Sequence, residues 1–250
     1  MRELSLPENK DWIIPDWPAP ANVKAIITTR AGGISTGQFA SFNIADHVGD
    51  DACAVAENRQ RLRQSLPSAP LWLMQVHGKR VVPAENTPAT READASVSDK
   101  PGTVLAIQTA DCLPVLLCDR AGTRVGAAHA GWRGLCSGVI EATVHAMNRP
   151  GDALLAYLGP AIGPRHFEVG AEVRAAFLGH DFRAAEHFLV CPNGKWLANL
   201  YGLARQRLAT VGVMDVYGGG FCTFAEQERF FSYRRDGVTG RMAALIWKVS

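Results

Sequence analysis

The sequence predicts a single α+β domain. Short apolar runs rich in β-branched residues alternate, in no fixed order, with segments of helical periodicity. The composition, 47% hydrophobic and 20% charged over 250 residues, is that of a globular protein long enough to bury one large core. Since neither an internal repeat nor a low-complexity linker divides the chain, one domain is favoured over two.

The first 22 residues are predicted to form an extended arm laid on the body, because prolines interrupt them at Pro7, Pro15, Pro18 and Pro20. The chain begins without the apolar segment of an export signal, and no window approaches the ~18 apolar residues of a membrane-spanning helix. We therefore expect a cytoplasmic protein whose catalytic domain occupies residues 23–250.

The remaining elements follow from periodicity and from capping residues. Strands are predicted over residues 23–29, 71–76, 104–108, 113–118, 124–128, 154–158, 213–217 and 242–248. Helices are predicted over residues 52–65, 137–148, 171–178 and 200–211. Asp50-Asp51 is expected to cap the first of these helices and Asn199 the last, and Gly212 is expected to close the last helix.

Charge and cysteine content exclude several classes of protein. The formal net charge of +2, without a run of like charges, gives no sign of a nucleic-acid or membrane partner, so a small neutral or mildly anionic ligand fits better. The six cysteines are expected to be reduced thiols, and no Cys-x-x-Cys pair supports a zinc ribbon or a thioredoxin-type site. The sequence leaves the oligomeric state open, with a monomer slightly favoured.

Residues 109–134 are the most informative segment, because they are expected to fold as a hairpin. A turn over residues 119–123 would set Leu113 opposite His129, so that Cys112 lies one residue away from that pair. Opposed Cβ atoms in such a hairpin lie ~5 Å apart, which suits a shared metal or a thiolate–imidazole pair. His77, at the end of another apolar run and followed by Gly78, is the third candidate.

Two imidazoles and one thiolate would leave a Zn²⁺ ion net positive and keep a fourth coordination position open, as in a catalytic zinc site. The alternative for Cys112 is a core cysteine, and for His77 and His129 it is a hydrogen-bonded structural histidine.

Several motifs in combination resemble the YfiH-like family, known as multicopper polyphenol oxidase (laccase-domain) proteins and as purine nucleoside phosphorylases. The motifs are Thr29-Arg30-Ala31-Gly32-Gly33-Ile34-Ser35, Gln75-Val76-His77-Gly78, Asp94-Ala95, Thr109-Ala110-Asp111-Cys112-Leu113-Pro114-Val115, Ala128-His129-Ala130-Gly131-Trp132-Arg133-Gly134, Leu158-Gly159-Pro160-Ala161-Ile162-Gly163-Pro164 and Phe231-Ser232-Tyr233-Arg234-Arg235-Asp236-Gly237. The resemblance runs from about residue 24 to the C-terminus, and residues 164–167 depart from a cysteine-rich sequence often found there.

The resemblance implies a three-layer domain with mixed β-sheets flanked by helices, in which His77, Cys112 and His129 are the zinc-binding and catalytic residues. It also implies phosphorolysis of adenosine, inosine, guanosine and methylthioadenosine, and deamination of adenosine. The expected partners are accordingly a purine nucleoside and phosphate.

Phosphorolysis requires a bound phosphate, and arginines in the glycine-bearing motif loops are its candidate ligands: Arg30, Arg133, Arg234 and Arg235. Asp94 and Asp111 are candidates to move a proton in deamination, with turn capping as the alternative. The usual zinc deaminase signature is absent, so deamination would use a different arrangement of residues. The roles of His166 and of Cys222, which could line the cleft, stay open.

Three other functions compete with phosphorolysis. A copper oxidase is disfavoured, and zinc is preferred to copper, because seven dispersed histidines are too few for a multicopper enzyme. A metal-free cysteine hydrolase would use Cys112 as nucleophile and His129 as base. A peptidoglycan-precursor editing factor, a further role attached to this family by name, would use a similar phosphate-binding cleft.

Overall fold

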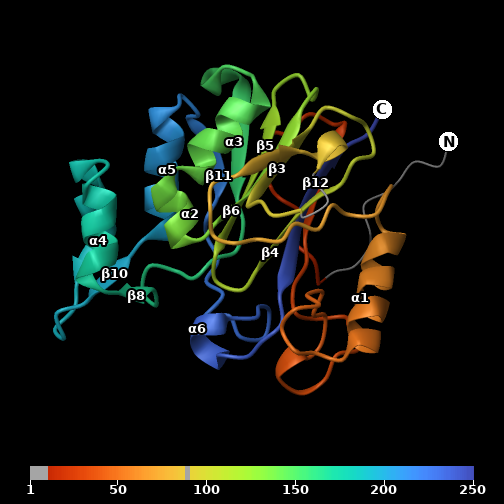
Figure 1. The fold of residues 1–250 in the computed structure, drawn as a ribbon, viewed down its shortest axis with the longest axis horizontal. Coiled ribbons are helices and arrows are strands. Elements are labelled where there is room, and N and C mark those ends of the chain that lie inside the picture. Colours follow the sequence, from red (N-terminus) through yellow and green to blue (C-terminus); the bar gives the residue numbers. More distant parts are fainter. Residues whose placement is uncertain (1–10, 88–90) are drawn as a thin grey trace.

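Three β-sheets form the framework of the computed structural model, which describes residues 11–87 and 91–250 (Figure 1). The largest has the order β11-β7-β5-β6-β3-β2, with β2 (Val81–Pro83), β3 (Ala95–Ser98), β5 (Leu113–Asp119), β6 (Val125–Ala130), β7 (Leu154–Leu158) and β11 (Asp215–Gly218). The second has the order β1-β12-β4, with β1 (Val23–Ile27), β4 (Leu105–Thr109) and β12 (Met242–Lys248). The third, β8-β10-β9, joins β8 (Glu168–Val169), β9 (Phe188–Val190) and β10 (Trp196–Ala198).

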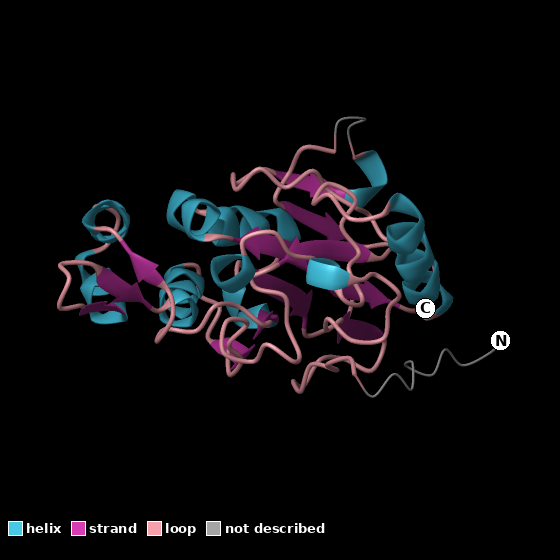
Figure 2. Cartoon of the chain, turned by 90° about the horizontal axis from the view of Figure 1, so that it is seen from below, coloured by secondary structure: helices cyan, strands magenta, loops and turns pink. Residues whose placement is uncertain are grey.

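Helices cover the outer faces of these sheets (Figures 1 and 2). They are α1 (Ala52–Gln64), α2 (Trp132–Ser137), α3 (Val139–Met147), α4 (Ala171–Leu178), α5 (Leu200–Thr210) and the short α6 (Tyr233–Asp236). In Figure 1, α2, α3 and α5 lie on one side of the large sheet, and α1 lies on the far side of the molecule. Within the described residues, none of these helices has the length and apolar character needed to cross a membrane.

The core is layered because strand side chains alternate between faces. Leu117 of β5 belongs to the cluster formed with α3 and α5, whereas its neighbour Leu116 belongs to the cluster shared with Ile107 of β4. The other face of the β1-β12-β4 sheet packs Leu245 against Leu62 of α1. The predicted α+β class with mixed sheets flanked by helices is confirmed, and its central layer consists of two stacked sheets.

Most predicted helices are confirmed, with their caps. Asp51 accepts a hydrogen bond from the Ala54 N–H at the start of α1, and Asn199 accepts one from Gly202 at the start of α5. The helix predicted over residues 137–148 is confirmed as α3. A short helix that was not predicted, α2, precedes it, and Gly138, with a left-handed φ of 95°, separates the two.

The strand predicted over residues 71–76 is not formed, and only isolated bridges occur, from Leu71 to Leu105 and from Met74 to Glu92. Here the side chain of Gln75 replaces backbone pairing. Its Nε2 donates to the Gln108 carbonyl at 2.8 Å, and its Oε1 accepts from the Gln108 N–H at 2.8 Å. The segment therefore runs alongside β4 without joining the sheet.

The predicted hairpin exists, but its register was predicted wrongly by one residue. β5 and β6 pair Leu113 with Ala130 and Pro114 with His129. Because a one-residue shift moves every side chain to the other face, this correction matters for the site. Continued by one position, the observed register sets Cys112 opposite Gly131, so Cys112 and His129 lie on the same face of the hairpin.

The described part of the N-terminal arm lies on the body: Ile13 pairs with Ile27, and Trp12 contacts Phe42 with ring centroids 5.6 Å apart. Pro7 and the rest of residues 1–10 lie outside the described residues, and the arm boundary at residue 22 stays a prediction.

Candidate metal centre and active site

His77, Cys112 and His129 converge on one point, with one potential ligand atom from each within 4.8 Å of the others. The Cys112 sulfur lies 3.7 Å from Nε2 of His77, and the two imidazole rings meet edge to face with centroids 4.7 Å apart. His129 is at the end of β6, Cys112 directly precedes β5, and His77 follows the 71–75 segment. Three chain segments distant in sequence thus supply the three groups.

Glycine is required where these groups approach the backbone. A Cβ atom on Gly131 would lie 2.8 Å from Cδ2 of His77 and 2.9 Å from the Cys112 sulfur. A Cβ on Gly134 would lie 2.7 Å from the Gly78 carbonyl oxygen. The Gly-Trp-Arg-Gly sequence after His129 therefore allows α2 to pass directly over the histidine loop.

Asp94 holds both histidines in place. Its fully buried carboxylate accepts hydrogen bonds from the backbone N–H groups of Val76, His77 and Gly78 at 3.2, 2.9 and 2.7 Å. Oδ1 also accepts from Nδ1 of His129 at 2.8 Å. A carboxylate bonded to one ring nitrogen fixes the tautomer and leaves the other nitrogen as a metal ligand or base. Asp94 is thus placed as an orienting residue, a role the sequence gave no means to separate from turn capping.

The site separates charge between the thiol and an imidazole. Burial alone would raise the pKa of Cys112, but positive charge and hydrogen bonding from His129 and His77 lower it to about 6. Burial alone would lower the pKa of His129, but Cys112 and Asp94 raise it. Burial also opposes ionisation of Asp94, yet hydrogen bonds from His129 and the loop N–H groups keep its pKa below the usual value. Without metal, the site therefore favours a thiolate beside an imidazolium.

The three residues line a pocket of about 740 Å³. Its walls include the arginines Arg59, Arg91, Arg133 and Arg241, and the one lining carboxylate, Asp46, is paired with Arg59 at 3.0 Å. The pocket is therefore basic although the whole chain carries a formal net charge of only +2. Such a pocket suits an anionic ligand.

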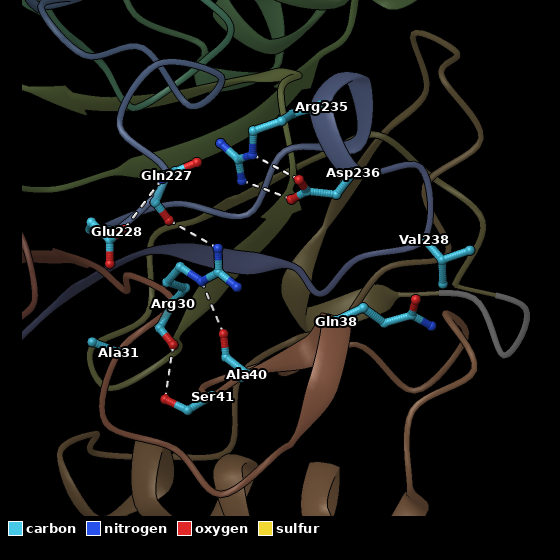
Figure 3. A pocket seen from close by; sticks show the side chains of 10 residues that line it. All are labelled: Arg30, Ala31, Gln38, Ala40, Ser41, Gln227, Glu228, Arg235, Asp236 and Val238. Atoms are coloured by element: carbon cyan, nitrogen blue, oxygen red, sulfur yellow. Dashed lines mark hydrogen bonds and ion pairs between the residues drawn. The ribbon is translucent and has the colours of Figure 1, made fainter.

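Of the four arginines predicted to bind phosphate, Arg133 lines this pocket, with its guanidinium stacked on Trp132 at 4.5 Å. Arg30 and Arg235 line a different pocket (Figure 3). Arg234 donates from Nη1 to the Glu168 carbonyl at 2.7 Å and lies over the Phe167 ring. The structure thus brings one of the four to the metal ligands, and a phosphate role for the other three stays a prediction without support from these contacts.

Asp111 and Cys222 also serve other contacts. Asp111 has a left-handed φ of 93°, and its carboxylate accepts from the Thr223 hydroxyl at 2.6 Å and from the Arg234 N–H at 2.7 Å, tying two loops together. Cys222 lies 3.4 Å from Nδ1 of His166 and is not among the residues lining the metal pocket. All six cysteines are free, as predicted.

Sequence reasoning missed Arg241, whose backbone lies just before β12. The pairing of Met242 with Thr109, continued by one position, sets Arg241 opposite Ala110, close to Cys112. Nη1 of Arg241 donates to the carbonyls of Thr239 and Gly240 at 2.8 and 3.0 Å, which fixes the guanidinium. Burial lowers the pKa of Arg241, and negative charge on Cys112 and Asp111 partly offsets this effect. Only the long-range pairing of β4 with β12 reveals this proximity.

Together, the stacked sheets and the His-Cys-His pocket define a laccase-like domain class. The chain matches the family model described as multi-copper polyphenol oxidoreductase laccase over residues 24–249, and it belongs to that family.

Among similar proteins, one named purine nucleoside phosphorylase PA4543 from Pseudomonas aeruginosa is 56% identical over 237 residues, covering 94% of this chain and 98% of the relative. Purine nucleoside phosphorylase YfiH of Escherichia coli is 55% identical over 240 residues, covering 95% and 98%. The family resemblance predicted from the motifs is therefore confirmed.

Solved structures agree. Protein NMB0706 of Neisseria meningitidis superposes with a TM-score of 0.92 at 52% identity, covering 96% of this chain and all of that one (100%). YlmD of Geobacillus stearothermophilus superposes with a TM-score of 0.87 at 29% identity, covering 98% of both chains.

Proposed function

We propose that this protein is a zinc-dependent purine nucleoside phosphorylase acting on adenosine, inosine, guanosine and methylthioadenosine with phosphate as the second substrate. The observation that carries the proposal is the convergence of His77, Cys112 and His129 in a pocket lined by arginines. The relatives from Pseudomonas aeruginosa and Escherichia coli, both named purine nucleoside phosphorylases, support the same reaction.

The donor set fits Zn²⁺. Two imidazole nitrogens and one thiolate match the three protein ligands of a catalytic zinc site, and Asp94 supplies the carboxylate that such ligating histidines commonly bond. Copper in a multicopper oxidase requires further ligand clusters, and the described residues contain this one group of three. A bound Zn²⁺ would supply Lewis acidity towards a substrate oxygen.

The residues of the chain would bind and orient the two substrates. Breaking the ribosyl C–N bond passes through an oxocarbenium-like state, so a phosphate oxygen must be held against the anomeric carbon. Arg133 and Arg241 would hold that phosphate; the support for this role is that both line the pocket with the metal ligands. His129 is only 3% exposed, so little water reaches its side of the pocket to compete with phosphate.

Deamination of adenosine is proposed as a second reaction of the same pocket. It requires a proton carrier beside the metal ligands, and because His129 would be held as a zinc ligand, the candidate carriers are Asp94 and Asp111. Asp94 would orient His129 through the 2.8 Å bond, and Asp111 is held by Thr223 and Arg234.

The test is the dependence of base release on phosphate. Zinc-loaded protein with inosine should form hypoxanthine and ribose 1-phosphate only when phosphate is added, and variants lacking His77, Cys112 or His129 should form neither. Base release without phosphate, or release that survives removal of the three ligands, would contradict the proposal.

A metal-free cysteine hydrolase is the second candidate, because the lowered pKa of Cys112 and the neighbouring His129 are also the features of an activated thiol nucleophile. Chelation separates the two candidates: a hydrolase would keep its activity without metal and lose it on thiol alkylation. A cytoplasmic location and a monomeric state stay predictions from the sequence.

A further inference from the structure

Gln108, on β4, has an unused hydrogen-bonding group at the metal pocket. The residue lines the pocket and is only 7% exposed. Its backbone N–H and carbonyl are bonded to the side chain of Gln75, but its own side-chain oxygen Oε1 is buried without a hydrogen-bond partner among the described residues. Because a buried amide oxygen left unpaired is unfavourable, the carboxamide is available for a ligand.

A carboxamide can present either of two faces to that ligand. Rotation about the last side-chain bond exchanges Oε1, an acceptor, with Nε2, a donor, while the rest of the side chain stays in place. Adenine offers a donor at its 6-amino group beside an acceptor at N1. Hypoxanthine and guanine offer the reverse, an acceptor at O6 beside a donor at N1. One rotatable amide therefore pairs with both kinds of purine.

The surroundings of Gln108 suit a flat base. The segment bearing Trp72 runs alongside β4. The Leu71 N–H donates to the Val104 carbonyl at 2.8 Å, and the Gln75 side chain accepts from the Gln108 N–H. Trp72 lines the same pocket, and the Arg59 guanidinium lies 5.0 Å above its ring. Aromatic and guanidinium faces are stacking surfaces for bases. Cys112 is a metal ligand and Arg241 is the proposed phosphate ligand, so Gln108 and Trp72 are the lining residues left to bind the base.

We propose that Gln108 is a base-binding residue that pairs with N1 and the 6-substituent of the purine, and that rotation of its amide lets the site accept 6-amino and 6-oxo bases alike. This inference rests on the proposed function, because it names the base-binding part of that site.

The test replaces the rotatable amide by a group that only accepts hydrogen bonds. In Gln108→Glu the carboxylate accepts hydrogen bonds from both N1–H and the 2-amino group of guanosine. Adenosine offers it one donor, the 6-amino group, and the lone pair of its N1 is repelled by the carboxylate. The ratio of kcat/KM for guanosine to that for adenosine should rise at least about tenfold, the equivalent of one hydrogen bond to a charged group. Gln108→Leu should lower kcat/KM for both nucleosides and leave the ratio within about threefold.

Gln38→Glu is the matched control, since Gln38 lines the other pocket and gains the same charge. It should leave the ratio within about threefold of the original. A ratio in Gln108→Glu within threefold of the unmodified protein, or an equal shift in Gln38→Glu, would overturn the inference.

Calorimetric titration of guanosine and adenosine without phosphate separates this inference from the proposed function. If no phosphorolysis occurs but the Kd ratio shifts in Gln108→Glu, the proposed function fails and base reading stands. If phosphorolysis occurs and neither ratio moves, base reading fails and the function stands. Should Gln108→Glu not fold, Gln108→Leu still decides, because unchanged binding of both nucleosides would exclude a contact.

Discussion

Two pockets of this protein are lined by arginines, and the guanidinium groups in them do different work. In the pocket of Figure 3, Arg30 donates from Nε to the Ala40 carbonyl and from Nη1 to the Gln227 carbonyl, both at 2.9 Å. Arg235 donates to the carbonyls of Thr223, Phe224 and Phe230 at 2.9 to 3.0 Å and pairs with Asp236. These guanidinium groups join loops.

In the metal pocket, Arg241 bonds two carbonyls through Nη1 alone, and within residues 11–87 and 91–250 it makes no ion pair. Arg133 is held mainly by stacking on Trp132. A guanidinium has five N–H donors, so those not bonded to the protein are available to an anion. Whether an arginine-lined pocket can bind an anion therefore depends on how many guanidinium N–H groups are already bonded to the protein. Four experiments test this difference between the two pockets.

The largest effect is expected from the metal ligands. The double variant Cys112→Ala, His129→Ala should lose the zinc that the unmodified protein carries at about one ion per chain, and phosphorolysis should fall by roughly a thousandfold or more. Elemental analysis of the purified protein measures the zinc. The matched control is Cys222→Ala, His166→Ala, which removes the other close cysteine–histidine pair and should keep the zinc. Full zinc retention in the first variant would refute the site.

The second effect is the pH dependence of Cys112 alkylation in chelated protein. A thiolate reacts and a thiol does not, so the rate should rise with pH and level off above a midpoint near the lowered pKa of about 6, rather than near 9.0. At pH 7 this makes Cys112 roughly a hundredfold more reactive than an unshifted thiol of the same nucleophilicity.

Site-resolved mass spectrometry with iodoacetamide measures the rate. Cys118, fully buried and with its pKa raised to about 12, is the internal control and should stay unmodified. His129→Gln should move the Cys112 midpoint upward because it removes the imidazolium. A midpoint that stays near 9 in the unmodified protein would show that the thiolate–imidazolium pair does not form.

The third experiment concerns Arg235, whose guanidinium is bonded to loop carbonyls in the pocket of Figure 3. Arg235→Met should lower the free energy of unfolding by about 2–3 kcal/mol, because three loop carbonyls lose a charged donor. The melting temperature should fall by roughly 5–10 °C, measured by calorimetry. The KM for phosphate should change by less than about threefold. A larger rise in KM with unchanged stability would instead favour the phosphate role predicted from the sequence.

The sequence allowed prediction of those parts of the fold that local patterns determine. Asp51 and Asn199 cap helices where predicted, and the periodicity of residues 171–178 reproduces α4. In residues 71–76 the Gln75 side chain, and not the backbone, bonds the neighbouring strand. No local sequence pattern indicates such a contact, so these residues were predicted as a strand. The register error at His129 arose because the exact turn residues were not fixed by the sequence.

The candidate site divides in the same way. His77, Cys112 and His129 are of residue types that commonly bind metals, so they can be selected as candidates from the sequence. Arginines occur in many loops, and their roles depend on which carbonyls lie within reach. Arg234 and Arg235 follow one another in sequence, yet one bonds Glu168 and the other bonds the loop at residues 223–230. Only the tertiary structure separates these arginines from Arg241.

The smallest effect is expected from Arg133, which is the one arginine chosen from the sequence that the structure places in the metal pocket. Arg133→Met removes a charged donor that is exposed to solvent, and a partner screened by water contributes less than a buried one. The KM for phosphate should therefore rise by about fivefold to tenfold, with a much smaller change in the KM for inosine. Steady-state kinetics with each substrate varied in turn measure both constants.

Arg133→Lys is the companion variant, because it keeps the charge and loses the planar fork; its KM for phosphate should lie between those of the other two proteins. If KM for phosphate is unchanged in Arg133→Met while the melting temperature falls, Arg133 belongs with Arg235 among the arginines that hold the fold. In that case Arg241 alone would remain as the proposed phosphate ligand, and the contrast between the two pockets would rest on that residue.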